Sequence, residues 1–202
     1  MNKHFRVTKI QKFKLPLRSL ILVSGVLSVL VVSTLYSPKA VADSINNTDF
    51  VFTVDTRKPG SPDTQFVIPT SGPGYNYTVD CNNDGTVEAS GQTAVYTCNY
   101  TTPGIYTIRI GGVFPWFIVN GSGDKMKLLS VDQWGTNKWK NMRSAFAGAE
   151  NMDVKATDTP DLSQATDLSW MFVGNKSLKG ESANWNWNTS TITKMSGVFQ
   201  NA

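Results

Sequence analysis

Three stretches near the end of the 202-residue sequence share one pattern: MRSAFAGA at 142–149, LSWMFVGN at 168–175 and MSGVFQNA at 195–202. They recur at steps of 26 and then 27 residues. Apolar residues fall mainly at i, i+3, i+4 and i+7, which is one face of a short α-helix. A fixed step of roughly 20–50 residues is typical of a solenoid in which each repeat buries its apolar stripe against the next. The pattern therefore predicts a stack of short helical repeats.

Residues around these stretches extend the prediction. Thr166 and Thr193 stand two residues before the second and third stretches, where a hydroxyl can cap the first helical turn. Trp134 and Trp139 are expected to cap the top of the stack. Because the sequence stops at Ala202, inside the third repeat, we expect an array that is incomplete at its C-terminus. Its last apolar face would then fray or self-associate.

The region before the repeats is typical of a small β-sandwich. Short β-branched and aromatic runs alternate with turns that contain Gly, Pro and Asn. The predicted strands cover residues 50–54, 65–68, 75–81, 95–100, 105–110, with 116–119 as one more candidate and 127–131 leading into the repeats. The expected fold class is therefore α+β, with a β-sandwich at 47–119 followed by a short solenoid of 26–27-residue repeats at 120–202.

The first 42 residues have the composition of a secretory signal peptide. Six basic residues and no acidic residue lie in the first 18 positions, before the apolar run Ser19–Tyr36. Ala40, Val41 and Ala42 then form a cleavage-site pattern. The alternative is an uncleaved anchor, because the apolar run is near the length of a membrane span. We expect a cleaved signal, and thus a secreted or cell-surface protein with no membrane span after cleavage.

Charge and histidine content exclude two classes of function. Of 19 Lys and Arg residues, seven lie in residues 1–42, whereas none of the 15 Asp and Glu residues do. The mature chain thus has 12 basic and 15 acidic residues, a net charge of −3, and lacks the basic face of a nucleic-acid-binding protein. The single histidine, His4, lies in the removed segment. Histidine-dependent catalysis is excluded, and no enzyme is expected.

Cys81 and Cys98 are the two cysteines, and each lies in a predicted strand. An exported chain with an even number of cysteines favours a disulfide between them. The alternative is a pair of buried free thiols. If the cysteines are paired, no thiol nucleophile remains.

Asp80, Asn82 and Asp84 match the first half of a calcium loop, with a glycine at its sixth position. Glu88 falls at the ninth position, but Gly91 stands at the twelfth in place of the closing Glu. The alternative is a hairpin turn in which Asn and Asp side chains bond to their own backbone. Calcium is the one cofactor that the sequence suggests, and the turn is the favoured interpretation.

Trp185 and Trp187 alternate with asparagines at 184, 186 and 188. On a strand, this alternation would place both indoles on one face. Exposed indoles beside amides would suit a glycan or a protein partner. The alternative is that both pack beneath the solenoid, and at least one is expected in the core.

The repeat motif resembles that of a known group. TDLSWMF at 166–172 and TKMSGVF at 193–199 resemble the T-x-M-S-x-M-F motif of BspA-type leucine-rich-repeat, DUF285-like, bacterial surface proteins. NTSTIT at 188–193 is similar to their D-T-S-N-V-T element. The β-region, with GYNYTVD at 74–80 and PGIYTIRI at 103–110, is similar to the PKD-like sandwich that often precedes such arrays.

This resemblance implies an exported surface protein that binds other macromolecules, protein or glycan, without a catalytic site. We therefore expect a secreted or cell-surface adhesion protein that acts through its repeat surface. The alternative function is a carbohydrate-binding module or a calcium-stabilised structural stalk.

Overall fold

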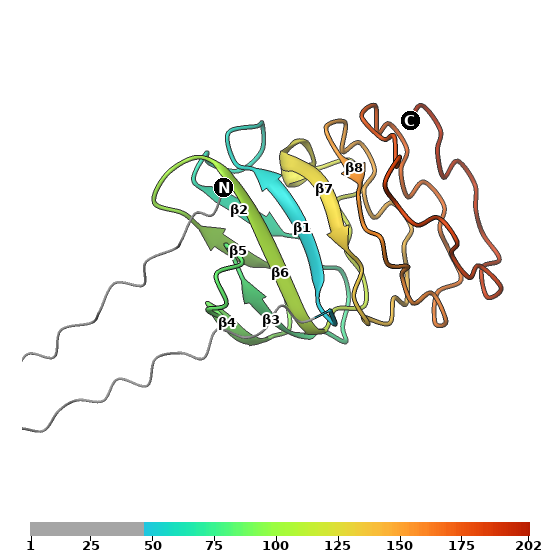
Figure 1. Ribbon diagram of the computed structural model, residues 1–202, viewed down its shortest axis with the longest axis horizontal. Helices are drawn as coiled ribbons and strands as arrows, with labels where there is room; N and C mark the ends of the chain where they lie inside the picture. The colour runs from blue at the N-terminus through green and yellow to red at the C-terminus, as the bar shows by residue number, and fades with distance from the viewer. Residues whose placement is uncertain (1–46) are drawn as a thin grey trace, which may run out of the picture. The chain divides into compact units, whose positions relative to one another are not determined.

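Strands and turns, without any α-helix, make up the part of the chain that the structure describes, residues 47–202 of a computed structural model (Figure 1). The predicted signal peptide at 1–42 lies outside these residues. The single helical element within them is a short 3-10 helix, η1 (Gly123–Lys127). No helix in residues 47–202 is long and apolar enough to cross a bilayer.

Eight strands in the described region form two sheets. The two-stranded sheet pairs β2 (Gln65–Ile68) with β5 (Tyr96–Asn99). The other sheet has six strands in the order β4 (Ala89–Gln92), β3 (Asn76–Asp80), β6 (Ile105–Val113), β1 (Phe50–Asp55), β7 (Leu128–Gln133) and β8 (Asp153–Val154). Strands β7 and β8 lie beyond residue 119, so this sheet contains segments from both predicted domains. Their mutual pairing is parallel, and the other neighbours pair antiparallel.

The centre of the larger sheet is β1, whose β-branched and aromatic residues suit a strand with neighbours on both sides. Phe52 lies opposite Ile108 of β6 and opposite Val131 of β7. Its ring is also 5.6 Å from that of Phe66 in β2, so the two sheets share a core there. All four side chains are fully buried.

A buried lysine fixes the segment between β1 and β2. Lys127 is fully buried, and its ammonium group donates to the carbonyls of Ser61, Pro62 and Gln65 at 2.7–3.0 Å. Burial lowers the pKa of this lysine. Asp124, at the other end of η1, is also buried and accepts from the Ser61 N–H at 2.6 Å. The two charges therefore hold one loop from opposite ends of η1.

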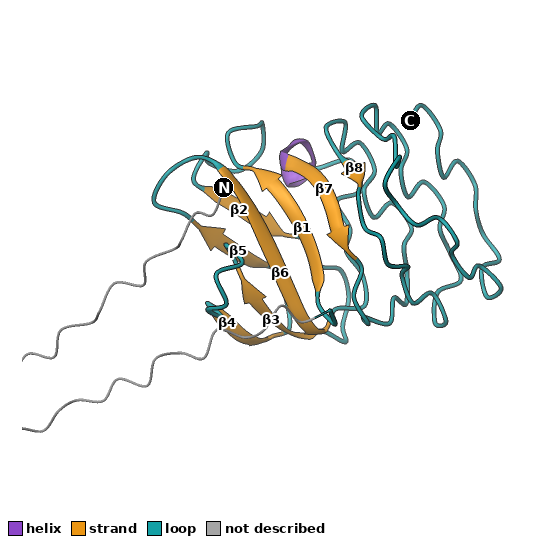
Figure 2. Ribbon diagram, viewed as in Figure 1, coloured by secondary structure: helices purple, strands orange, loops and turns teal. Residues whose placement is uncertain are grey.

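Residues 142–149, 168–175 and 195–202, named here coils 1, 2 and 3, are successions of turns and not helices (Figure 2). The α+β prediction is wrong, because the described chain has a β fold of two sheets with no α-helix. Turns closed over three residues, such as Ala145 N–H to Met142 O at 3.1 Å, replace helical hydrogen bonds.

Left-handed residues explain why the coils are not helical. Each coil has two residues with positive φ, four positions apart, and their φ values lie between 51° and 72°. The pairs are Ser144 and Gly148, Trp170 and Gly174, and Gly197 and Asn201. A right-handed helix contains no such residues. The turns nevertheless return a side chain to the same face every three or four residues, so the apolar spacing resembles that of a helix.

The coils stack at the predicted steps of 26 and 27 residues. Alternate N–H groups of coil 1 donate at 2.7–3.1 Å, from Met142, Ser144, Phe146 and Gly148 to the carbonyls of Asp167, Ser169, Met171 and Val173. Coil 2 repeats the pattern at 2.8–2.9 Å, from Leu168, Trp170, Phe172 and Gly174 to Lys194, Ser196, Val198 and Gln200. Main-chain pairing between coils thus takes the place of pairing within a helix.

A column of phenyl rings follows the same stack. Phe146 and Phe172 stack with centroids 5.6 Å apart, and Phe172 and Phe199 repeat this spacing. Phe117 extends the column on the other side of Phe146, at 5.3 Å. The segment that contains Phe117 also donates to coil 1, from the Val119 N–H to Ala145 O at 3.1 Å. The stack therefore starts before the first repeat that the sequence pattern indicates.

The expected threonine caps are not formed. The Thr193 hydroxyl donates to Thr166 O at 3.3 Å, between neighbouring repeats. The first turns of coils 1 and 2 are capped instead by the side chains that directly precede them: Asn141 Oδ1 accepts from the Arg143 N–H at 2.9 Å, and Asp167 Oδ1 from the Ser169 N–H at 2.8 Å.

Two tryptophans join the sheets to the coils. Trp139 lies edge-on to Phe50 at 5.0 Å, and Trp134 contacts both Phe50 and Phe146 at 6.1 Å. Both indoles are fully buried. Strands and coils consequently share one continuous hydrophobic core, within one compact unit.

Candidate functional site

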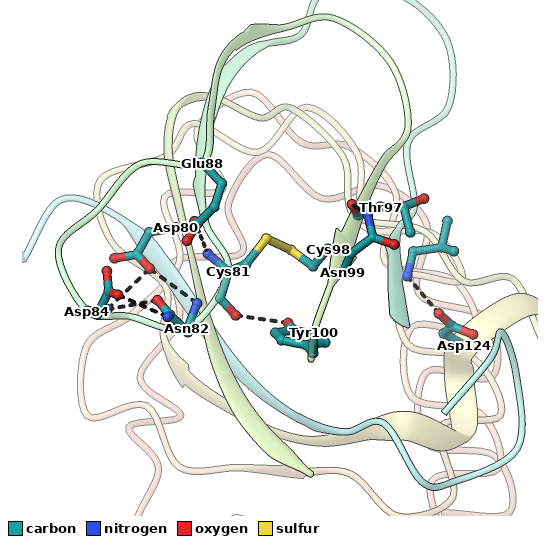
Figure 3. Close-up of a disulfide and its surroundings, with 11 residues drawn as sticks. Asp80, Cys81, Asn82, Asp84, Glu88, Thr97, Cys98, Asn99, Tyr100 and Asp124 are labelled. Carbon is teal, nitrogen blue, oxygen red and sulfur yellow. Dashed lines mark hydrogen bonds between the residues drawn. A yellow bond between two sulfur atoms is a disulfide. The ribbon is translucent and has the colours of Figure 1, made fainter. Parts of the chain in front are cut away.

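Cys81 and Cys98 form a disulfide, which confirms the predicted pairing (Figure 3). Cys81 directly follows β3 of the six-stranded sheet, and Cys98 lies in β5 of the two-stranded sheet. The bond therefore ties the two sheets together, with the Cα atoms 5.7 Å apart. Both residues are buried, and neither is available as a thiol nucleophile.

The Asp80 turn is closed by its own side chains (Figure 3). Asp80 is buried, and its carboxylate accepts from the N–H groups of Asn82, Asp84 and Gly85 at 2.9–3.3 Å. Asn82 Oδ1 accepts from the Asp84 N–H at 3.2 Å, and Asp84 Oδ1 accepts from the Thr86 N–H at 2.7 Å. The hydrogen bonds from Thr86 hold the pKa of the Asp84 carboxyl below its ordinary value.

Three carboxylates gather beside this turn. Oxygens of Asp80, Asp84 and Glu88 lie within 4.8 Å of one another, so Glu88 joins two of the predicted calcium ligands. Glu88 Oε2 also accepts from the Cys81 N–H at 2.7 Å. Carboxylate oxygens are the ligands that calcium prefers, so Asp80, Asp84 and Glu88 are the residues that could hold it. The turn is closed by protein hydrogen bonds, as the hairpin interpretation requires, and calcium binding stays a prediction.

Trp185 and Trp187 pack together, with ring centroids 5.2 Å apart, although the strand expected for their segment is not formed. Trp187 is half-buried and lies edge-on to Trp134 at 5.3 Å, whereas Trp185 is 39% exposed. The indole N–H of Trp185 donates to Gly180 O at 3.1 Å, and that of Trp187 donates to Asn184 O at 2.9 Å. Trp187 therefore extends the core, and Trp185 presents only part of its ring.

A groove of about 370 Å³ opens where the beginnings of the three coils lie side by side. Each coil or its preceding turn contributes to the lining, which consists of Arg143, Asp167, Ser169, Trp170, Thr193, Lys194, Met195 and Ser196. Basic, acidic, hydroxyl and apolar side chains are thus combined in one depression. This mixture is typical of a binding surface that contacts both polar and apolar groups.

Trp170 is the central aromatic residue of this groove. Its ring centroid is 4.9 Å from the Arg143 guanidinium carbon, a cation–π contact. On Gly197, in coil 3, an added Cβ would lie only 2.7 Å from the Trp170 ring. The absence of a side chain there lets the indole lie across the next coil. Trp170 is 39% exposed.

The backbone of Trp170 is strained. Its φ is 58°, in the left-handed region that costs a residue with a side chain about 1–2 kcal/mol. The N–H of the same residue donates to Ser196 O at 2.9 Å, which fixes the backbone in place. Ser144 and Gly197 at the equivalent positions have φ values of 51° and 61°, so the turn requires this conformation in all three coils.

Two cations and one carboxylate set the charge of the groove: Arg143, Lys194 and Asp167. Asp167 Oδ1 already accepts from the Ser169 N–H. The lining therefore has a net positive charge of one.

Sequence reasoning missed this groove. The signal was present, because Trp170 occupies the position that Ser144 and Gly197 occupy in the other two repeats. A large aromatic residue at a place where the other repeats have small ones indicates that this side chain is not part of the repeated core. The prediction named Trp185 and Trp187 instead, on their alternation alone.

The fold defines a class of β protein in which a two-sheet core continues into a stack of turn-built repeats. Residues 119–202 match the model of a family described as Mycoplasma protein of unknown function, DUF285. No curated protein and no solved structure matches the chain. The family match coincides with the stack, from the segment beside coil 1 to coil 3. The finer resemblances, to BspA-type leucine-rich repeats and to a PKD-like sandwich, stay predictions.

Proposed function

We propose that this protein is an exported, non-catalytic binding protein that contacts a protein partner at a cell surface through the groove around Trp170. The observation that carries the proposal is Trp170 itself: a partly exposed indole, held at a strained backbone position, between Arg143 and Gly197. Trp, Arg and Met are enriched in protein interfaces, and Trp and Arg carry much of the binding energy. Export rests on the signal-like sequence of residues 1–42.

The absence of catalysis is part of the proposal. The groove has a single carboxylate, Asp167, and no histidine or cysteine. A lone carboxylate bound to a backbone N–H supplies neither a paired acid and base nor an activated nucleophile. Recognition by shape and charge is the function that the lining supports.

The test is to probe the labelled chain against an array of extracellular proteins and, in parallel, against a glycan array. A hit on the protein array that Trp170→Ala weakens about tenfold or more supports the groove, because central interface tryptophans carry losses of that size. Trp185→Ala is the matched control, since both indoles are 39% exposed. A hit that Trp185→Ala abolishes and Trp170→Ala leaves unchanged would contradict the proposal.

The alternative function is glycan binding at Trp185 and Trp187, favoured by their adjacent rings and the surrounding asparagines. Against it, both indole N–H groups already donate within the chain, so they offer a sugar only ring faces. Hits confined to the glycan array, lost in Trp185→Ala, would support this alternative. A calcium-stabilised stalk would instead show a melting temperature that rises with added calcium. This rise should be lost in the double variant Asp84→Asn with Glu88→Gln, and a rise that persists in the variant would show that the ion binds elsewhere.

A further inference from the structure

Both strands of the two-stranded sheet have an outer edge, and the two edges differ. At the edge of β2, the Val67 N–H donates to Asp124 Oδ2 at 2.7 Å. Gln65 O, on the same edge, accepts from the Lys127 ammonium group at 2.9 Å. Figure 3 shows Asp124 beside β2, on the side away from β5. The main chain of β2 is therefore bonded on both sides, and two buried charged side chains close its outer edge.

Strand β5 has no such closure among residues 47–202. The Tyr100 N–H donates to Thr64 O at 2.8 Å, so Cys98, two residues earlier, also directs its main-chain groups at β2. Thr97 and Asn99 consequently direct theirs outward. In the described region, the N–H of Thr97 and both main-chain groups of Asn99 have no partner, and Thr97 O accepts only from the Asn99 side chain, at 3.1 Å.

The sequence of this edge lacks the features that keep strand edges apart. Exposed edges in soluble proteins are usually blunted by charge, by proline or by a bulge. Residues 89–102 contain no Lys, Arg, Asp, Glu or Pro. Strand β4, the edge of the larger sheet within the same stretch, has a bulge that includes Gly91, with a φ of 64°. Strand β5 pairs regularly with β2 and has none of these features.

The edge of β5 is also held in place from behind. Cys98 is joined to Cys81 by the disulfide, and the Gln65 side chain donates to Asn99 Oδ1 at 3.0 Å across the sheet. An added strand would therefore need little further ordering of the edge. Val95, the residue before β5, is 52% exposed, so a strand that continues past the start of β5 would also cover apolar surface.

We propose that β5 is a self-association edge, at which the chain pairs antiparallel with β5 of a second copy. A two-fold pairing centred on Cys98 sets Thr97 opposite Asn99 of the second copy, and the reverse. Residues that lie opposite each other in this way exchange two N–H to carbonyl bonds, so every unpaired main-chain group of Thr97 and Asn99 gains a partner. Strands β2 and β5 of both copies would then form one four-stranded sheet.

The composition of the edge favours a second copy over a different polypeptide. In a two-fold pairing each strand meets its own sequence, so any charges would face like charges, and β5 has none. Each outward residue offers one donor and one acceptor, which makes the strand complementary to itself. A different partner is selected largely by complementary charge, and this edge has no charge with which to select it.

This edge is separate from the groove of the proposed function. Strand β5 belongs to the two-stranded sheet, whereas Trp170 and Arg143 lie in the coils. A dimer would carry two grooves, which raises the apparent affinity for a multivalent surface without any new contact to it. A Trp170→Ala variant should leave self-association unchanged.

The experiment follows amide hydrogen exchange of the full chain by NMR at a series of protein concentrations, together with sedimentation equilibrium. We expect the amides of Thr97 and Asn99 to exchange fast in dilute protein and to slow as the dimer forms. The amides of Tyr100 and Val67, which are bonded within the chain, should be protected throughout. Exchange at single residues separates pairing at β5 from association through any other surface.

Charge variants test the pairing itself. In Thr97→Lys with Asn99→Lys, lysines of the two copies would face each other, so association should weaken about tenfold or more. Thr97→Glu with Asn99→Glu should behave alike. Mixed in equal amounts, the lysine and glutamate variants should associate with each other, because opposite residues then carry opposite charges. The recovered association would show that neither variant is misfolded.

The matched control is Ser90→Lys with Gln92→Lys, which adds the same charge to the edge strand β4 and should leave association unchanged.

Other results would overturn the proposal. Fast exchange of the Thr97 and Asn99 amides at every concentration would show that a second copy does not occupy the edge, and would leave it to solvent or to a different polypeptide. Slow exchange at every dilution would show that another segment of the same chain covers it. Association that the β4 lysines weaken as strongly, or that the mixture fails to recover, would place the contact elsewhere.

Discussion

The phenyl rings of Phe146 and Phe172 lie parallel, with an angle of 9° between their planes and 5.6 Å between their centroids. Phe172 is fully buried between coils 1 and 3. Replacing it with Ala would remove the contacts of one ring with both neighbours and leave a cavity. We expect Phe172→Ala to lower the free energy of unfolding by about 3–5 kcal/mol.

Urea unfolding followed by tryptophan fluorescence measures this change. Phe199→Ala is the matched control, because its ring ends the same column but is 55% exposed. The control should cost far less. Equal losses in the two variants would show that the column is not packed as described.

The disulfide gives a second prediction. Cys81 and Cys98 close a loop with a sequence separation of 17 and join the two sheets. In the chain-entropy model, a loop of this size contributes about 3 kcal/mol. The double variant with Ser at both positions should lose stability of that order. Mass spectrometry after alkylation without reduction should find no labelled cysteine, and two labelled thiols would contradict the pairing.

Lys127 gives a third prediction. Its ammonium group is fully buried and donates to three carbonyls and to Ser61 Oγ. Lys127→Met keeps the length of the side chain but removes these four hydrogen bonds, while Pro62 O and Gln65 O each keep one other donor. We expect a loss of about 3 kcal/mol in the free energy of unfolding. Lys58→Met, at an exposed lysine, is the control and should be nearly neutral.

The fourth prediction concerns alkaline pH. Burial raises the pKa of Tyr77 to about 12, and its hydroxyl donates to Ala94 O at 2.6 Å. In the unfolded chain the pKa of tyrosine is about 10. From about pH 10 to 12 the unfolded state therefore releases this proton while the folded state keeps it. The contribution of Tyr77 to stability should be complete below about pH 10 and should fall as the pH rises toward 12.

Tyr77→Phe separates this contribution from other effects of alkali. The variant should lose about 1 kcal/mol near neutral pH, through the missing hydrogen bond, and its stability should fall less between pH 10 and 12. Urea midpoints at a series of pH values measure both effects. Parallel curves for the variant and the parent would rule out Tyr77 as the titrating group.

The sequence predicted the repeat step because Phe146, Phe172 and Phe199 are equivalent in space as well as in the pattern. It did not predict the backbone of the repeats, since helices and these turns return side chains to one face at nearly the same spacing. Trp170 takes a left-handed conformation without being glycine, as Ser144 does at the equivalent position of coil 1. Phe117 was missed because its distance from Phe146 in the sequence does not match the repeat step.

The disulfide, the buried charges and the groove also differ in how far the sequence predicts them. Cys81 and Cys98 were predictable from compartment, number and placement on strands, all of which are local or compositional signals. The buried pair of Asp124 and Lys127 was not, because charged side chains are expected at the surface unless a specific loop supplies their partners. That loop is Ser61 to Gln65, which lies about sixty residues earlier in the chain. The groove at Trp170 required three repeats to be placed side by side.

The common direction of the hydrogen bonds between coils has an electrostatic consequence. Eight N–H to carbonyl bonds point the same way across the two interfaces of the described coils. Peptide dipoles aligned in this manner add, as they do along an α-helix, and leave partial positive charge where the N–H groups are unsatisfied. Within residues 47–202, the positive ends of these dipoles therefore all point from coil 1 toward coil 3, although the described coils contain no α-helix. An acidic side chain is favoured on the side toward which the N–H groups point, and a lysine on the side of the carbonyls.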